Sequence, residues 1–196
     1  MALPSESHLP GTAKEVELIS KHSSELEVVS LLESQATRHN VTEALKASSW
    51  AHFACHGSQD PWNASRSYLS LANNTKLELS EMIELRLDTA ELAFLSACET
   101  ATGDKKLEEE AIHLAAGMLL AGYRGVIATL WTINDSIAPE VADETYRRLL
   151  KEFCGDPTRA AEALHLAVRK VCEDWETKRG TPLSFFSWVP FIHMGI

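Results

Sequence analysis

The sequence is most informative at residues 90–102, which read AELAFLSACETAT. Within this stretch, Leu92, Ala93, Phe94 and Leu95 form a short apolar run, which is typical of a strand buried in a sheet. Small and polar residues follow the run, and Cys98 is among them. A strand that ends in this way presents a thiol at the carboxyl edge of its sheet, where open α/β sheets bind ligands. The stretch therefore predicts an α/β fold with a cysteine at the functional edge of the sheet.

A second short apolar run ends in a histidine. Residues 50–57 read WAHFACHG, so His56 and Gly57 follow the run directly. If both runs form parallel strands that stop at the same edge, His56 and Cys98 lie close together, although 42 positions separate them. An imidazole beside a thiol can stabilise the thiolate or accept its proton, as a nucleophilic cysteine requires. The order, with the histidine first and the cysteine about 50 residues later, is the caspase-type arrangement.

Three stretches in this order resemble one known family: HFACHG, FLSACET and GYRGVIATLWTIND. They are similar to the CHAT domain, a caspase-like cysteine peptidase domain related to separases and metacaspases. Residues 109–131 in particular resemble the CHAT domains that close fungal proteins with tetratricopeptide repeats. The resemblance covers residues 50–196 well and the first 49 more loosely. It implies a His56–Cys98 dyad, with the amides of Gly57 and Cys98 forming the oxyanion hole.

Strands and helices alternate along the chain. Alternation of this kind predicts a mostly parallel sheet with helices on both faces, and with the resemblance it gives a caspase-like three-layer α/β sandwich. The expected strands are residues 27–32, 50–57, 92–95 and 126–131, a hairpin over residues 68–79 around Asn73-Asn74, and a last strand within residues 185–196. The expected helices are residues 12–21, opened by a Thr12–Glu15 capping box, residues 42–48, a helix after Ser80, residues 111–121, one from Pro139, and a long one after Asp156-Pro157.

The first expected helix has no strand ahead of it. A caspase-like sheet normally begins with such a strand, and residues 1–11 are polar and contain two prolines. We therefore expect residues 1–196 to form a single CHAT domain that is a C-terminal fragment of a larger protein and lacks its first strand.

Length, composition and charge indicate one acidic globular domain. Hydrophobic residues make up 45% of the 196 residues and charged ones 23%. The formal net charge of -10 argues against nucleic acid as a partner, because that binding depends on clustered Lys and Arg. Four cysteines without CxxC spacing favour a reducing compartment. Residues 1–11 lack the features of a secretory signal, and His113, Gly122, Arg124 and Gly125 interrupt the apolar residues 111–131. We therefore expect a cytoplasmic protein without a membrane span.

Three further residues are candidates for substrate binding. Asp60 follows His56-Gly57, Asp135 follows the expected strand 126–131, and either carboxylate could select Arg or Lys before the scissile bond. Both are equally consistent with loop caps. Trp131 is expected to line the pocket wall. No third catalytic group, organic cofactor or metal is expected. A metal bound by His52, Cys55 and His56 is the competing interpretation, which the alternation of side chains along a strand disfavours.

The preferred interpretation is a cysteine endopeptidase that cleaves a protein or peptide substrate, with the helical-repeat region of the parent chain as its partner. Two alternatives remain open: a caspase-like docking module without activity, and a thiol acyltransferase on a similar sheet.

Overall fold

The computed structural model describes residues 10–22, 24, 26–58, 60, 62–96, 111–131, 133 and 136–196. Seven α-helices within this part of the chain are α1 (Pro10–Ser20), α2 (Arg38–Ala47), α3 (Leu79–Glu84), α4 (Ala111–Ala121), α5 (Ala138–Lys151), α6 (Ala160–Arg179) and α7 (Phe185–Trp188). The strands are β1 (Trp50–Phe53), β2 (Gly57–Ser58), β3 (Tyr68–Leu71), β4 (Thr75–Glu78), β5 (Leu92–Leu95), β6 (Gly125–Thr129) and β7 (Phe191–Gly195). Short 3-10 helices are η1 (Glu33–Gln35), η2 (Ala64–Arg66), η3 (Ala72–Asn74) and η5 (Pro157–Arg159).

The main sheet has four strands in the order β1-β5-β6-β7. Strands β1, β5 and β6 are parallel, and β7 returns antiparallel to β6. The predicted, mostly parallel sheet is therefore confirmed. The last strand is shorter than residues 185–196, since α7 takes up Phe185–Trp188 before β7 begins.

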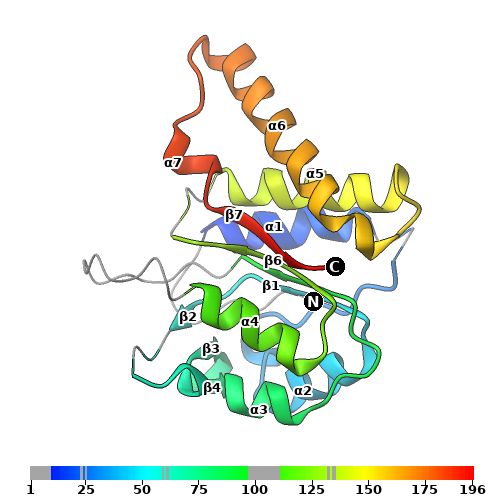
Figure 1. The fold of residues 1–196 in the computed structure, drawn as a ribbon, viewed down its shortest axis with the longest axis vertical. Helices are drawn as coiled ribbons and strands as arrows, with labels where there is room; N and C mark the ends of the chain where they lie inside the picture. Colours follow the sequence, from blue (N-terminus) through cyan, green and yellow to red (C-terminus); the bar gives the residue numbers. More distant parts are fainter. Residues whose placement is uncertain are drawn as a thin grey trace.

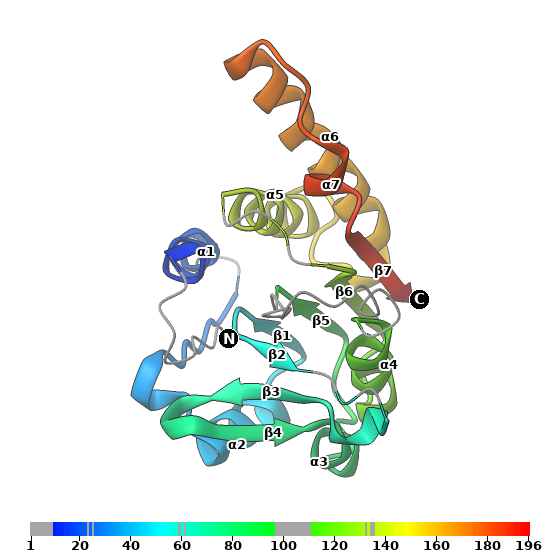
Figure 2. The same cartoon turned by 90° about the vertical axis from the view of Figure 1, so that its left-hand side faces the viewer.

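Helices cover both faces of this sheet (Figures 1 and 2). Ala51, Phe53 and Leu95 point into one buried cluster, which they share with residues of α2, α3 and α4. Phe94 and Ile127 point the opposite way, into a cluster with α1, α5 and α6. Side chains of successive strand residues alternate between faces, so each parallel strand contributes to both clusters and is buried on both sides. The expected α/β sandwich is confirmed.

A second, smaller sheet of order β2-β3-β4 lies below the main one in Figure 1. Its antiparallel hairpin pairs Leu69 with Leu77, and both side chains are fully buried. Asn73 and Asn74 form the turn with φ of 57° and 54°, in the left-handed region that asparagine tolerates better than most residues. The predicted hairpin is confirmed.

The predicted strand over residues 27–32 is wrong. These residues belong to no helix or strand, and Val29 and Leu32 are exposed by 48% and 38%. β-branched residues favour a strand only where a partner strand and a covering face are present. Within the described chain, no strand pairs with this segment.

Candidate active site

Strands β1 and β5 lie side by side and end at the same edge of the sheet. The register pairs Trp50 with Leu92 and Phe53 with Leu95, so each residue of β1 lies opposite the residue 42 positions later. The Ser96 amide extends this ladder by donating to the Phe53 carbonyl at 2.9 Å. The same offset of 42 separates His56 from Cys98. The two parallel strands with a common edge, which the sequence predicted, are therefore confirmed.

Cys98 and Asp135 lie outside the described residues. The last described residue of this segment is Ser96, which is buried at the end of β5, two positions before Cys98. The roles of the cysteine and of Asp135 therefore stay predictions.

His56 lies where the chain passes from the main sheet to the small one. Ala54 and Cys55 are both buried, and they connect the end of β1 to His56, which β2 follows immediately. The His56 carbonyl accepts a hydrogen bond from the Ser70 amide at 2.8 Å, which fixes its backbone to the end of β3. The histidine as a whole is half-buried.

The Gly57 amide is directed away from the small sheet. In an antiparallel pair, successive residues alternate between facing the partner strand and facing away from it. His56 faces β3 through its bond to Ser70, so Gly57, which lies opposite Leu69, faces the other side. An amide with this orientation, next to a histidine and on a residue that has no side chain of its own, suits an oxyanion donor.

Next to Gly57, the side chains of Ser58, Tyr68 and Lys76 contact one another. A hydrogen bond from the side chain of Ser58, together with Lys76, lowers the pKa of the Tyr68 hydroxyl. Ser58 and Tyr68 lie opposite each other in β2 and β3, and the Lys76 ammonium sits 3.8 Å from the centre of the Tyr68 ring. The small sheet therefore carries polar groups on β2 and β3 and a positive charge, Lys76, on β4.

The three described cysteines differ in burial, and two of them have thiols with a raised pKa. Cys55 is fully buried, and this burial raises the pKa of its thiol to about 12. Burial, with a contribution from Glu173, also raises the pKa of Cys172. Cys154 is exposed, in the turn after α5. Since a thiolate is the reactive form, Cys55 and Cys172 are poor nucleophiles.

Asp60 is engaged within its own loop. One carboxylate oxygen accepts hydrogen bonds from the amides of Trp62 and Asn63, both at 3.0 Å, and the other lies 3.7 Å from Nε of Arg66. These contacts are those of a loop cap, which was one of the two interpretations of Asp60. Sequence reasoning did not single out Trp62, whose side chain is 95% exposed in the same loop. A large aromatic residue in a polar loop beside His56 was the available signal.

Trp131 follows β6 and is fixed to the C-terminal segment. Its indole Nε1 donates to the Phe186 carbonyl at 3.0 Å, and the two rings are 6.4 Å apart. Phe185 and Phe186 themselves are largely exposed. Trp131 therefore forms part of an aromatic surface over α7.

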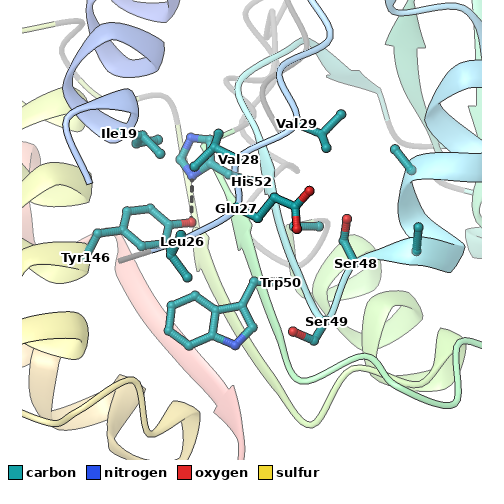
Figure 3. A pocket seen from close by; sticks show the side chains of 13 residues that line it. Ile19, Leu26, Glu27, Val28, Val29, Ser48, Ser49, Trp50, His52 and Tyr146 are labelled. Atoms are coloured by element: carbon teal, nitrogen blue, oxygen red, sulfur yellow. Dashed lines mark hydrogen bonds between the residues drawn. The ribbon is translucent and has the colours of Figure 1, made fainter. Parts of the chain in front are cut away.

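A buried polar cluster connects three elements of the main sheet and its covering helices. His52 of β1 and Glu15 of α1 are 2% and 3% exposed, with His52 Nε2 3.1 Å from a carboxylate oxygen of Glu15. The two atoms are not aligned as a hydrogen bond, and both are buried without another hydrogen-bond partner among the described residues. The other ring nitrogen of His52 lies 3.2 Å from the Tyr146 hydroxyl of α5 (Figure 3). Burial, and then the charge of Glu15, raises the pKa of Tyr146.

The competing metal interpretation needs the side chains of His52 and Cys55 on the same face of the sheet. His52 contacts Phe94 and Tyr146 on the α5 face, whereas Cys55 belongs to the core of the opposite face. In the described part of the chain, no three His, Cys, Asp or Glu residues are grouped so that they could hold a metal ion.

Among the described helices, none has the length and apolar character needed to cross a bilayer.

The fold and the edge of the sheet define a class of α/β protein with a histidine and a glycine amide just beyond the carboxyl end of a parallel strand. The profile of one family, the CHAT domain, matches residues 2–196. The chain therefore belongs to the CHAT domain family, which is related to caspase-like cysteine peptidases. No curated protein sequence matches the chain significantly.

Proposed function

We propose that the protein is a cysteine endopeptidase that uses a His56–Cys98 dyad. The observation that carries this proposal is the register of β1 and β5, whose offset of 42 equals the separation of the two residues. Because both strands run in the same direction, the segments that leave them start from the same edge of the sheet.

The proposed reaction follows from these positions. The Cys98 thiolate attacks the scissile carbonyl, and the amides of Gly57 and Cys98 stabilise the oxyanion that forms. His56 donates a proton to the leaving amine, and a water molecule then releases the acyl group from the sulfur. No organic cofactor or metal takes part in this scheme.

Substrate selection is proposed to involve the loop after Gly57 and the segment after β6. Asp60, Trp131 and Asp135 are the proposed substrate-binding residues, with a basic residue before the cut. One carboxylate oxygen of Asp60 is bound within its own loop, and the other lies near Arg66. Because Asp60 is already engaged in this way, Asp135 is the better first target for substitution.

The proposed setting is a cytoplasmic signalling protein. The chain would be an effector domain whose partner, a helical-repeat region, recognises a target and controls the site. The net charge of -10 suits a basic peptide substrate and disfavours nucleic acid.

An activity-based probe tests the dyad. A peptidyl acyloxymethyl ketone with Arg or Lys before the reactive group should label the wild-type protein once, and mass spectrometry should place the label on Cys98. Cys98→Ala and His56→Ala should abolish labelling, whereas Cys154→Ala, which removes an exposed cysteine elsewhere, should leave it unchanged. Labelling that persists in Cys98→Ala refutes the proposal.

A docking module is the second candidate, and one observation favours it. Phe185 and Phe186 are 58% and 72% exposed on α7, and exposed aromatic pairs are typical of interaction surfaces. A docking module would bind its partner equally well as wild type and as Cys98→Ala, and neither protein would cleave peptides. Turnover of thioesters or esters without peptide cleavage would instead indicate an acyltransferase.

A further inference from the structure

The order of the strands sets the direction in which a substrate would cross the proposed active site. The main sheet runs β1-β5-β6-β7, so the end of β5 lies between the ends of β1 and β6. In the proposed reaction, Cys98, which follows β5, attacks the scissile carbonyl, and His56, which follows β1, protonates the leaving amine. The scissile bond therefore points from β5 toward β1. The residues after the cut continue past β1, whereas the residues before it extend over β6.

The small sheet lies on the side toward which the residues after the cut extend, which we call the leaving-group side. In Figures 1 and 2, β2 lies below β1 and the rest of the small sheet lies further below, whereas α7 lies above β6. Neighbouring strands are about 4.8 Å apart and an extended chain advances about 3.3 Å per residue, so the second residue after the cut already lies beyond β1. The loop between β2 and β3 is thus on the leaving-group side.

This loop, which joins Ser58 to Tyr68, is braced by its own hydrogen bonds. At its base, the Asp60 amide donates to the hydroxyl oxygen of Ser67 at 3.2 Å, and Ser67 is fully buried. Further along, the Asp60 carboxylate accepts from the amides of Trp62 and Asn63, both at 3.0 Å. These bonds hold the backbone of Trp62 in place relative to the strand pair β2–β3, so its position is set before any substrate binds.

The side chain of Trp62 extends from the braced loop into solvent. Trp62 is 95% exposed, whereas the other four tryptophans of the chain are each partly buried. Among the described residues, no aromatic ring or cation contacts its indole. An indole offers a large, rigid apolar face whose burial is favourable, so a pre-organised and unoccupied one is suited to contact a ligand.

The polar side chains around Trp62 are occupied with one another. The Asp60 carboxylate lies 3.7 Å from Nε of Arg66, so the two charges offset each other. The Ser65 hydroxyl donates to the side-chain oxygen of Asn63 at 2.7 Å. The indole is therefore the main group that this loop offers to a substrate, and its complement is an aromatic or large aliphatic side chain.

We propose that Trp62 is a specificity residue for the leaving-group side, where its indole packs on an aromatic or large aliphatic side chain at one of the first three positions after the cut. This role rests on the proposed peptidase function and adds a substrate preference to it. The contact exists while the leaving segment is attached and ends when the amine product departs. Trp62 therefore acts on formation of the acyl-enzyme and not on its hydrolysis.

Two sets of substrates with one shared acyl segment test the proposal on the chain of residues 1–196. The first set is internally quenched peptides with Arg before the cut and Phe, Leu, Ala or Glu at each of the three positions after it. The second is the methyl ester of the same acyl segment, which has no residue after the cut. At one of the three positions, the wild type should favour Phe or Leu over Ala by about tenfold in kcat/KM, as expected for one aromatic contact.

Variants of Trp62 assign this preference to the indole. Trp62→Ala should abolish the preference, so the ratio of kcat/KM on the preferred peptide to kcat/KM on the methyl ester should fall about tenfold. Trp62→Phe should retain most of it, because a ring remains. Leu120→Ala is the matched control, because Leu120 is also exposed, at 70%, but lies on α4 shortly before β6 begins, toward the opposite edge of the sheet. This control should keep the wild-type ratio.

Three results would overturn the assignment of Trp62 alone. These are a wild type that cleaves the peptides without preference after the cut, a Trp62→Ala variant that keeps the preference, and a Trp62→Ala variant that loses equally on peptides and methyl ester. A wild type that cleaves neither set and is not labelled at Cys98 would instead refute the proposed peptidase, and the role of Trp62 with it.

Discussion

Replacing His52 by leucine should destabilise the protein because it leaves two buried polar groups without their neighbour. Glu15 is 3% exposed, and an imidazole nitrogen of His52 lies 3.1 Å from its carboxyl oxygen. Leaving one buried polar group without a partner costs about 1–3 kcal/mol, so Glu15 and Tyr146 together give about 2–6 kcal/mol. The Tyr146 hydroxyl loses its partner in the same variant.

This loss is large against the whole stability of a domain, which is about 5–15 kcal/mol. For a domain of this size, each kcal/mol corresponds to a Tm shift of about 2–4 °C, so His52→Leu should melt about 4–24 °C lower than the wild type. The double variant Glu15→Leu/His52→Leu removes both polar side chains of the pair and should recover about 1–3 kcal/mol of the loss. Its remaining deficit should be about 1–3 kcal/mol, which is the cost of leaving the Tyr146 hydroxyl unpaired.

Urea unfolding of the wild type, the two single variants and the double variant measures the coupling in a double-mutant cycle. Tyr146→Phe serves as the matched control, because it removes a hydroxyl from the same cluster and leaves the Glu15–His52 contact in place, at a cost of about 1 kcal/mol. The reasoning fails if the double variant is no more stable than His52→Leu. A coupling energy below about 0.5 kcal/mol would lead to the same conclusion.

Three further predictions concern the described residues. N-ethylmaleimide at pH 8 should modify Cys154 in the folded protein and Cys55 only after denaturation, because burial raises the pKa of Cys55 to about 12; modification of both at similar rates contradicts this. Burial lowers the pKa of His193, so the folded state binds a proton less well than the unfolded chain, and the free energy of unfolding should fall as the pH drops below about 6.5. Urea titrations should show a smaller fall for His193→Phe, and an unchanged fall would exclude His193 as a contributor. Gly122→Ala should cost about 1–3 kcal/mol, because φ is +124° and the new Cβ would lie 2.5 Å from the Leu87 carbonyl oxygen. Gly155→Ala, with φ of +77° and open space around it, should lose less in the same thermal melts.

Local sequence patterns predicted most helices and the hairpin well. Residues 111–121, apolar on nearly every side, form α4 with the predicted bounds, and Asn73-Asn74 makes the turn between β3 and β4. These features depend on residues a few positions apart, which sequence periodicity and turn preferences record directly.

Patterns that depend on distant partners were less informative. The β-branched residues 27–32 have strand propensity, but strand formation needs a neighbour that the local sequence does not specify. Glu15 fits a capping box with Thr12, yet α1 begins at Pro10, and the Glu15 carboxylate is buried against His52 of β1. Tertiary burial thus determines the role of Glu15, and spacing within one helix could not reveal it.

In the candidate site, too, local patterns predicted one feature, the strand pair, and left another, the role of Asp60, open. That β1 and β5 would be parallel and end together followed from two apolar runs with polar ends, and the register confirms it. The sequence left Asp60 open between a selectivity residue and a loop cap, because its loop contacts depend on the path of residues 60–66. The roles of Cys98 and Asp135 stay predictions.

The position of His56 between two sheets has a mechanical consequence. Only Ala54 and Cys55 separate it from β1, and β2 follows it at once, so both sheets fix its backbone position. A substitution that displaces β3 would therefore displace the His56 backbone as well, because the Ser70 amide is bonded to the His56 carbonyl.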